Sequence, residues 1–209
     1  ANAGLGKTVT LTGAFLNGLD AGNYTLTMST TTADINKADA AIVVTGYSGV
    51  YDDVAHRASG TVTGVAGDLA AIGSSLDLGV SFADAPGGTA TWTFSGGTNY
   101  NDATGSVAID ITQATVTITG DGLNGSGYFG TYDGAAHAAT ATVRGVGGAI
   151  LGQLTSSTTH TNAGIYSDTV TYTDGTGNYK NASKTVKSYV LKATVTITGD
   201  GLNGSGYFG

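Results

Sequence analysis

The sequence predicts an all-β protein made of small β-sandwich modules arranged in tandem. The residues from Ala114 to Gly130 recur unchanged from Ala193 to Gly209, and a repeat at fixed spacing is typical of modular arrays. All 15 acidic residues are Asp, Gly numbers 35 and Thr is abundant, so the composition favours turns and strands over helices. Apolar residues also alternate with Thr in several segments, which indicates sheets buried on one face.

Asn-Tyr pairs at a constant distance from a later Ala divide the chain into repeats. Each Tyr lies 14 positions before its Ala; the pairs are Tyr24 with Ala38, Tyr100 with Ala114, and Tyr179 with Ala193. We therefore expect four segments: the C-terminal part of one module at 1–37, complete modules at 38–113 and 114–192, and the first strand and loop of the next repeat at 193–209.

The expected strands follow the alternation along the chain. The clearest lie at 91–94, 107–112, 115–119, 169–173 and 195–197. Turn pairs separate them, at Asn17-Gly18, Gly96-Gly97, Asn124-Gly125, Asp133-Gly134 and Asp174-Gly175. No segment has the pattern of a long amphipathic helix, and only a short turn is expected at 68–72. Six or seven short strands in fewer than 80 residues favour a β-sandwich over a barrel.

Two tyrosine patterns predict strand corners. The segments 20–24 and 162–166 are similar to the segment that carries the corner tyrosine of immunoglobulin-like domains, whose hydroxyl bonds back to the backbone. These segments predict that the sandwiches are Ig-like. The constant position of Tyr100 and Tyr179 within the repeat predicts that both rings are largely buried.

Four stretches together resemble the MBG and YDG repeat modules of very large bacterial surface proteins, including filamentous-haemagglutinin-like adhesins. They read GKTVTLTGAFLNGLDAGNYTL, YDDVAHRASGTVTGV, PGGTATWTFSGGTNYNDATGSVAIDITQA and YDGAAHAATATVRGVGG. Residues 1–37 resemble the YDG type and 38–192 the MBG type. The resemblance implies a secreted, non-catalytic stalk or adhesin segment. The second module departs from the first in having Ser188 in place of Ile109, so we expect its last strand to pack differently.

Composition excludes several classes of partner. The net charge of −7 leaves no basic surface for nucleic acid. No apolar run approaches the roughly 18 residues of a membrane helix, so no membrane insertion is expected. The absence of Cys rules out disulfides and thiolate metal sites, and the low charge suggests a protein secreted to the bacterial surface.

Few residues of the sequence suggest a catalytic or metal-binding site. His56 and His137 occupy equivalent places near an Asp, but no second histidine has ligand spacing, and no Gly-x-Ser-x-Gly motif is present. We therefore expect no enzyme and no cofactor. Calcium is the one alternative, since Ca²⁺ takes oxygen ligands; the candidate ligands are Asp52, Asp53, Asp121 and Asp200, which as turn-forming residues also have a purely structural explanation.

The expected function is mechanical: an extracellular stalk or fibre in a large bacterial adhesin or filament. Its partners would be neighbouring modules or identical chains, and Val195 and Ile197 would begin the next module of one long chain or complete a broken module of another chain. The alternative is a module that binds a host or matrix glycan or protein. The candidate contact residues are the aromatic side chains Tyr128, Phe129, Tyr207 and Phe208.

Overall fold

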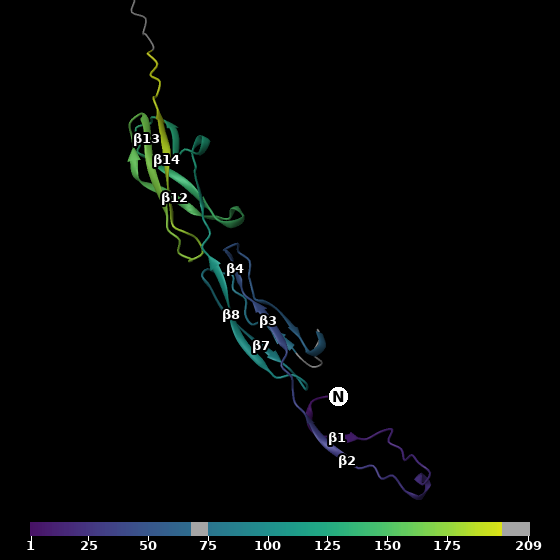
Figure 1. Cartoon of the computed structure of the whole chain (residues 1–209). Coiled ribbons are helices and arrows are strands. Elements are labelled where there is room, and N and C mark those ends of the chain that lie inside the picture. Colours follow the sequence, from purple (N-terminus) through teal and green to yellow (C-terminus); the bar gives the residue numbers. More distant parts are fainter. Residues whose placement is uncertain (68–74, 198–209) are drawn as a thin grey trace, which may run out of the picture. The chain divides into compact units, whose positions relative to one another are not determined.

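The protein is all-β, as the sequence predicts. A computed structural model describes residues 1–67 and 75–197 (Figure 1). The chain divides into a first unit, Ala1–Thr112, and a second unit, Gln113–Gly209. Helical geometry among the described residues is confined to short 3-10 turns, namely η1 (Ala21–Asn23), η2 (Val65–Gly67), η3 (Leu123–Gly125) and η4 (Val146–Gly148). The turn expected at 68–72 lies outside the described residues.

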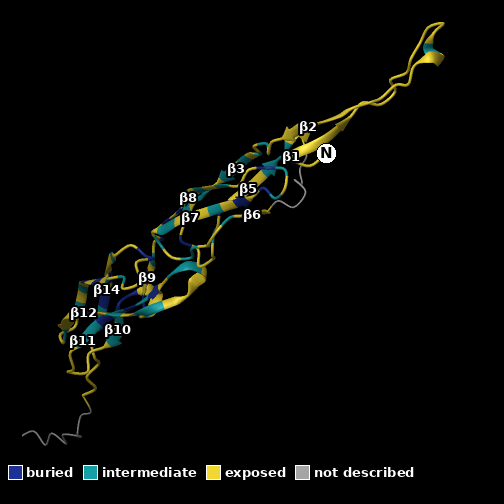
Figure 2. Cartoon of the chain, turned by 90° about the horizontal axis from the view of Figure 1, so that it is seen from below, coloured by how far each residue is buried: buried dark blue, intermediate teal, exposed yellow. Residues whose placement is uncertain are grey.

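The first unit begins with an antiparallel hairpin. Strand β1 (Gly4–Thr10) pairs with β2 (Thr30–Ile35), and nearly all of their residues are exposed (Figure 2). Tyr24, in the loop between them, is 72% exposed, so the corner expected at 20–24 does not form. A corner tyrosine needs a packed sheet edge behind it, and within the described residues β1 and β2 form a two-stranded sheet that is exposed at nearly every residue.

The rest of the first unit is a sandwich of six strands, which we call the first sandwich. Its strands are β3 (Ala41–Thr45), β4 (Tyr47–Val50), β5 (Ser59–Thr63), β6 (Ser75–Asp77), β7 (Gly87–Ser95) and β8 (Ala103–Thr112). One sheet contains β3 and β5, and the other has the order β4-β8-β7-β6 with β4 parallel to β8. Phe94 and Tyr100 are buried between the sheets, against partly buried side chains that include Ile42, Val62 and Trp92.

The second unit contains a corresponding second sandwich. Its strands are β9 (Thr117–Gly120), β10 (Tyr128–Thr131), β11 (His137–Arg144), β12 (Ile150–His160), β13 (Gly164–Tyr172) and β14 (Ala182–Leu191). The sheets have the orders β12-β11-β9 and β10-β14-β13, and β10 is parallel to β14 as β4 is to β8. Ile118, Ala141 and Val143 of the first sheet form one buried cluster with Val170 of the second.

The fourth strand, β6 in the first sandwich and β12 in the second, joins a different sheet in each. In the first sandwich β6 pairs with β7, whereas in the second the longer β12 pairs with β11. The first sandwich keeps one contact of the pairing seen between β11 and β12. His56 and Phe82 form an isolated antiparallel bridge there, at the place of the His137–His160 pair. His160 therefore stands where the first sandwich has Phe82.

The chain enters each sandwich at one end and leaves it at the other. Ala114 is held at the start of the second sandwich, because its N–H donates to the carbonyl of Asn178 and its carbonyl accepts from the N–H of Lys180, both at 2.9 Å. The residues that follow Lys180 lead into β14, which ends at Leu191. A ten-residue strand spans about 30 Å. Ala38 makes the same contacts with Asn99 and Asn101 in the first sandwich.

The predicted strands at 91–94 and 107–112 lie inside β7 and β8, and the one at 169–173 overlaps β13 as far as Tyr172, all with the expected alternation of burial. The strand expected at 115–119 begins only at Thr117. Residues 195–197 form no strand, although they copy 116–118, and Val195 and Ile197 are 84% and 90% exposed. The physical reason is pairing: β9 forms beside β11, and none of the described strands pairs with the copy.

Candidate functional site

Histidine, tyrosine and aspartate form the same cluster at equivalent places in the two sandwiches. In the first, the ring of His56 stacks on Tyr47 with centroids 3.7 Å apart, and its Nε2 lies 2.9 Å from Oδ1 of Asp52. In the second, His137 stacks on Tyr128 at 4.2 Å, and its Nε2 lies 2.9 Å from Oδ1 of Asp133. The sequence signal for both clusters is the shared pattern Tyr-x-Gly-x-Tyr-Asp-x-x-Ala-His.

The glycine of this pattern makes room for the tyrosine ring. The tyrosine lies along its own strand, over the glycine two residues later. A Cβ on Gly49 would lie 2.3 Å from the Tyr47 hydroxyl, and one on Gly130 would lie 2.3 Å from that of Tyr128. Neither glycine can therefore take a side chain unless the tyrosine moves.

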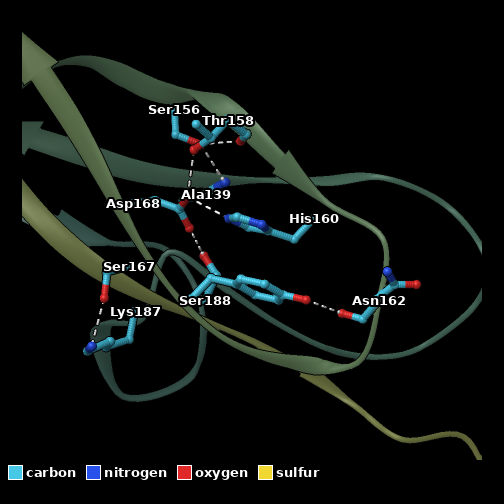
Figure 3. Close-up of polar contacts among 10 residues, drawn as sticks. Ala139, Ser156, Thr158, His160, Asn162, Ser167, Asp168, Lys187 and Ser188 are labelled. Carbon is cyan, nitrogen blue, oxygen red and sulfur yellow. Dashed lines mark hydrogen bonds and ion pairs between the residues drawn. The ribbon is translucent and has the colours of Figure 1, made fainter.

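A third cluster of this kind lies around a buried aspartate in the second sandwich (Figure 3). His160 stacks on Tyr166 at 3.8 Å, and its Nε2 lies 2.7 Å from Oδ1 of Asp168. The Asp168 carboxylate also accepts hydrogen bonds from the hydroxyls of Thr158 at 2.7 Å and Ser188 at 2.6 Å. Asp168 is 1% exposed, so the core of this sandwich contains a carboxylate with three side-chain donors.

Tyr166 of this cluster fulfils the prediction of a corner tyrosine. Its hydroxyl donates to the backbone carbonyl of Asn162 at 2.8 Å, the bond expected from the segment 162–166. Ser188, expected to change the packing of the last strand, leaves the strand pairing intact and donates inward to Asp168.

Hydrogen bonding lowers the pKa of the aspartates in all three clusters. The hydrogen bond from His56 is the main cause at Asp52, and the hydrogen bond from His137 is the main cause at Asp133. Burial of Asp168 acts to raise its pKa, but the hydrogen bonds from Ser188, Thr158 and His160 outweigh burial and lower it. The hydrogen bonds therefore favour the ionised form of each of these carboxylates.

Asp174 is the most strongly perturbed carboxylate. It follows β13 and accepts hydrogen bonds from the backbone N–H groups of Thr176, Gly177 and Tyr179, and from the Tyr172 hydroxyl. Desolvation acts to raise its pKa, but the bonds from Tyr179 and Thr176 outweigh desolvation and lower the pKa to about 2. The carboxylate thereby organises the loop between β13 and β14.

Acid should weaken the second sandwich as Asp174 becomes protonated. Since its folded-state pKa is about 2 and its ordinary value is 3.8, its contribution to the free energy of unfolding is complete above about pH 4 and is lost as the pH falls toward 2. An NMR titration of this carboxyl should have its midpoint near 2. Asp174→Asn should be less stable than the wild type at neutral pH and converge with it in acid. A midpoint at the ordinary value would contradict the prediction.

The calcium candidates that the structure describes are engaged in other contacts. Asp52 bonds to His56, and Oδ1 of Asp53 accepts from the Tyr51 hydroxyl at 3.0 Å. Asp121 accepts from the hydroxyl of Thr142 and the side-chain amide of Gln153. Within residues 1–67 and 75–197, no three Asp, Glu, His or Cys residues gather as metal ligands would. Asp200 lies outside the described residues.

The candidate contact aromatics separate to opposite faces of one sheet. Tyr128 turns toward the inner face and stacks on His137, whereas Phe129 points outward, is 43% exposed and approaches Tyr189 with ring centroids 6.0 Å apart. Tyr189 is not among the contact residues predicted from the sequence, although its place in the alternation of β14 predicts an outward side chain. Tyr207 and Phe208 lie outside the described residues.

A cleft of about 340 Å³ opens beside Phe129 and Tyr189. The loop after β9 forms one wall, and β14 contributes Lys184 and Lys187. The Lys184 ammonium donates to the carbonyl of Ile118 at 2.6 Å, and that of Lys187 donates to the Ser167 hydroxyl at 2.7 Å. Both lysines line the cleft, and the hydrogen-bond partners of their ammonium groups, Ile118 and Ser167, lie outside the lining.

Comparisons with protein families, with curated proteins and with solved structures found no match for this chain. No helix among the described residues is long and apolar enough to cross a membrane.

Proposed function

We propose that this chain is a non-catalytic structural segment of a large secreted bacterial surface protein, in which Ig-like modules in tandem form a stalk or fibre. The observation that carries the proposal is the path of the chain through each sandwich. The chain enters beside the loop that precedes the last strand and leaves at the far end of that strand, about 30 Å away. Modules joined in this way add length.

The joints between strands of successive repeats support the same proposal. Only residues 113–116 separate β8 from β9, and Ala114 among them is hydrogen-bonded at the start of the second sandwich. A joint this short lacks the length of a flexible linker. The resemblance of the repeats to MBG and YDG modules agrees with a stalk at the bacterial surface.

Small-angle scattering tests the stalk. Inserting a second copy of residues 114–192 after residue 192 should raise the maximum dimension by about 30 Å or more, because each module adds at least the length of its last strand. The matched control inserts the same number of Gly and Ser residues, which should give the scattering of a flexible tail. A longer chain whose maximum dimension stays unchanged would overturn the proposal.

The alternative function is recognition of a glycan or protein by exposed aromatic side chains. The specific observation in its favour is the outward pair Phe129 and Tyr189 beside the lysine-lined cleft. A stalk module can carry such a surface, so the two functions are compatible.

A further inference from the structure

The outer face of the β10-β14-β13 sheet carries a row of apolar side chains. Phe129 pairs with Tyr189 across β10 and β14, and Tyr189 pairs with Ile165 across β14 and β13. Phe129 and Ile165 are 43% and 69% exposed. Lys187 pairs with Ser167 two residues further along the same face. We call these residues, together with the adjoining cleft, the aromatic-lysine face.

The first sandwich lacks this surface. At the places of Phe129, Tyr189 and Ile165 it has the aligned row Ser48, Asp110 and Gly87. Ala108 stands in place of Lys187, and Thr89 in place of Ser167. The same strand pairing therefore forms without aromatic or basic side chains, so the fold does not require them.

The charge on this face is opposite to that of the chain as a whole. The chain has a net charge of −7 and 8 Lys and Arg residues, and two of these, Lys184 and Lys187, line the cleft. Strands β10 and β14 contain no acidic residue, and the one carboxylate of β13, Asp168, points inward and is buried. Lys184 and Lys187 therefore present positive charge without a neutralising carboxylate on the same strands.

We propose that the aromatic-lysine face binds a carboxylated saccharide. The apolar C–H face of a sugar ring stacks on Phe129 and Tyr189, while Lys184 and Lys187 pair with its carboxylates. The volume of about 340 Å³ is at the lower end of small-ligand sites and suits a few sugar rings at most. The inference rests on the recognition alternative of the proposed function, not on the stalk.

Titration calorimetry of the full chain with oligogalacturonate tests the proposal. The wild type should bind, and affinity should fall as NaCl is raised because charge pairing is screened. Phe129→Ala and the double variant Lys184→Gln, Lys187→Gln should each weaken binding by about tenfold or more. Asp110→Ala, at the equivalent place in the first sandwich, is the matched control and should bind like the wild type. Unchanged urea unfolding of each variant shows that the fold is retained.

The probes also separate the competing occupants. Neutral galactan oligosaccharides and polyglutamate should each bind at least about tenfold more weakly than oligogalacturonate. Equal binding of polyglutamate would identify an acidic-peptide surface, and self-association abolished by Phe129→Ala would identify an interface between copies. Either result, or no binding of oligogalacturonate, overturns the inference. Failure to bind oligogalacturonate, or equal binding of polyglutamate, leaves the scattering expected of a stalk unchanged, so either is distinguishable from a failure of the stalk proposal.

Discussion

Replacing Tyr100 by Ala should cost the first sandwich about 3–5 kcal/mol in free energy of unfolding, the range for losing a buried aromatic side chain. Tyr100 is 7% exposed and packs in the cluster of Phe94. Its hydroxyl accepts the N–H of Val65 at 3.0 Å, at the turn that follows β5. The ring thus joins the start of β8 to the opposite sheet. Tyr179 does the same in the second sandwich, accepting from Val146.

Urea unfolding followed by the emission of Trp92 measures this loss. Trp92 is the one Trp of the chain and packs against the same cluster, so its signal reports the first sandwich. Tyr100→Phe keeps the ring and should cost only about 1 kcal/mol, the worth of one hydrogen bond. Tyr24→Ala is the matched control, because Tyr24 also follows an Asn but is exposed, and it should change stability by less than about 0.5 kcal/mol. Equal effects at Tyr100 and Tyr24 would refute the structural role.

Replacing Asp168 by Ala should destabilise the second sandwich by about 3–5 kcal/mol, as expected when one partner of a buried charged network is removed. The substitution leaves the donors of Thr158, Ser188 and His160 without their common acceptor. Urea unfolding followed through resolved NMR amide signals of β13 and β14 measures the second sandwich separately from the first.

The first sandwich provides the compensating substitutions. At the places of His160, Asp168 and Ser188 it has Phe82, Ala90 and Ile109, and Ala90 and Ile109 are fully buried. The triple variant His160→Phe, Asp168→Ala, Ser188→Ile should therefore recover most of the stability that Asp168→Ala loses, because a packed apolar core can replace a buried polar network. A triple variant less stable than Asp168→Ala alone would show that the carboxylate is not the source of the loss.

Local chemistry was sufficient to predict the all-β class and the main strands. The alternation around Trp92, Ile109 and Val170 has the period of a strand buried on one face, and each residue lies in a strand with that pattern. The burial of Tyr100 and Tyr179 was also predicted from their constant place in the repeat. Tyr24 has the same place before Ala38 but is exposed, so position in the repeat leads to burial only where a sandwich forms around the ring.

Contacts between segments distant in the sequence decided which copies of a repeated segment form strands and which sheet each strand joins. The residues at 116–118 and 195–197 are identical, yet Thr117 and Ile118 enter a strand and the copy does not, because a strand requires hydrogen-bonding partners from elsewhere in the chain. The sheet that the fourth strand joins, β6 in the first sandwich and β12 in the second, likewise depends on pairing that no local pattern encodes.

The sequence by itself determined the repeat, the strand period, the turn residues and the histidine-aspartate spacing, since all of these are set by neighbours along the chain. Only the tertiary structure placed Asp168 among Thr158, His160 and Ser188, and only strand register aligned Phe129 with Tyr189. The physical reason is that burial of a carboxylate and the joining of side chains into one surface depend on which strands lie side by side.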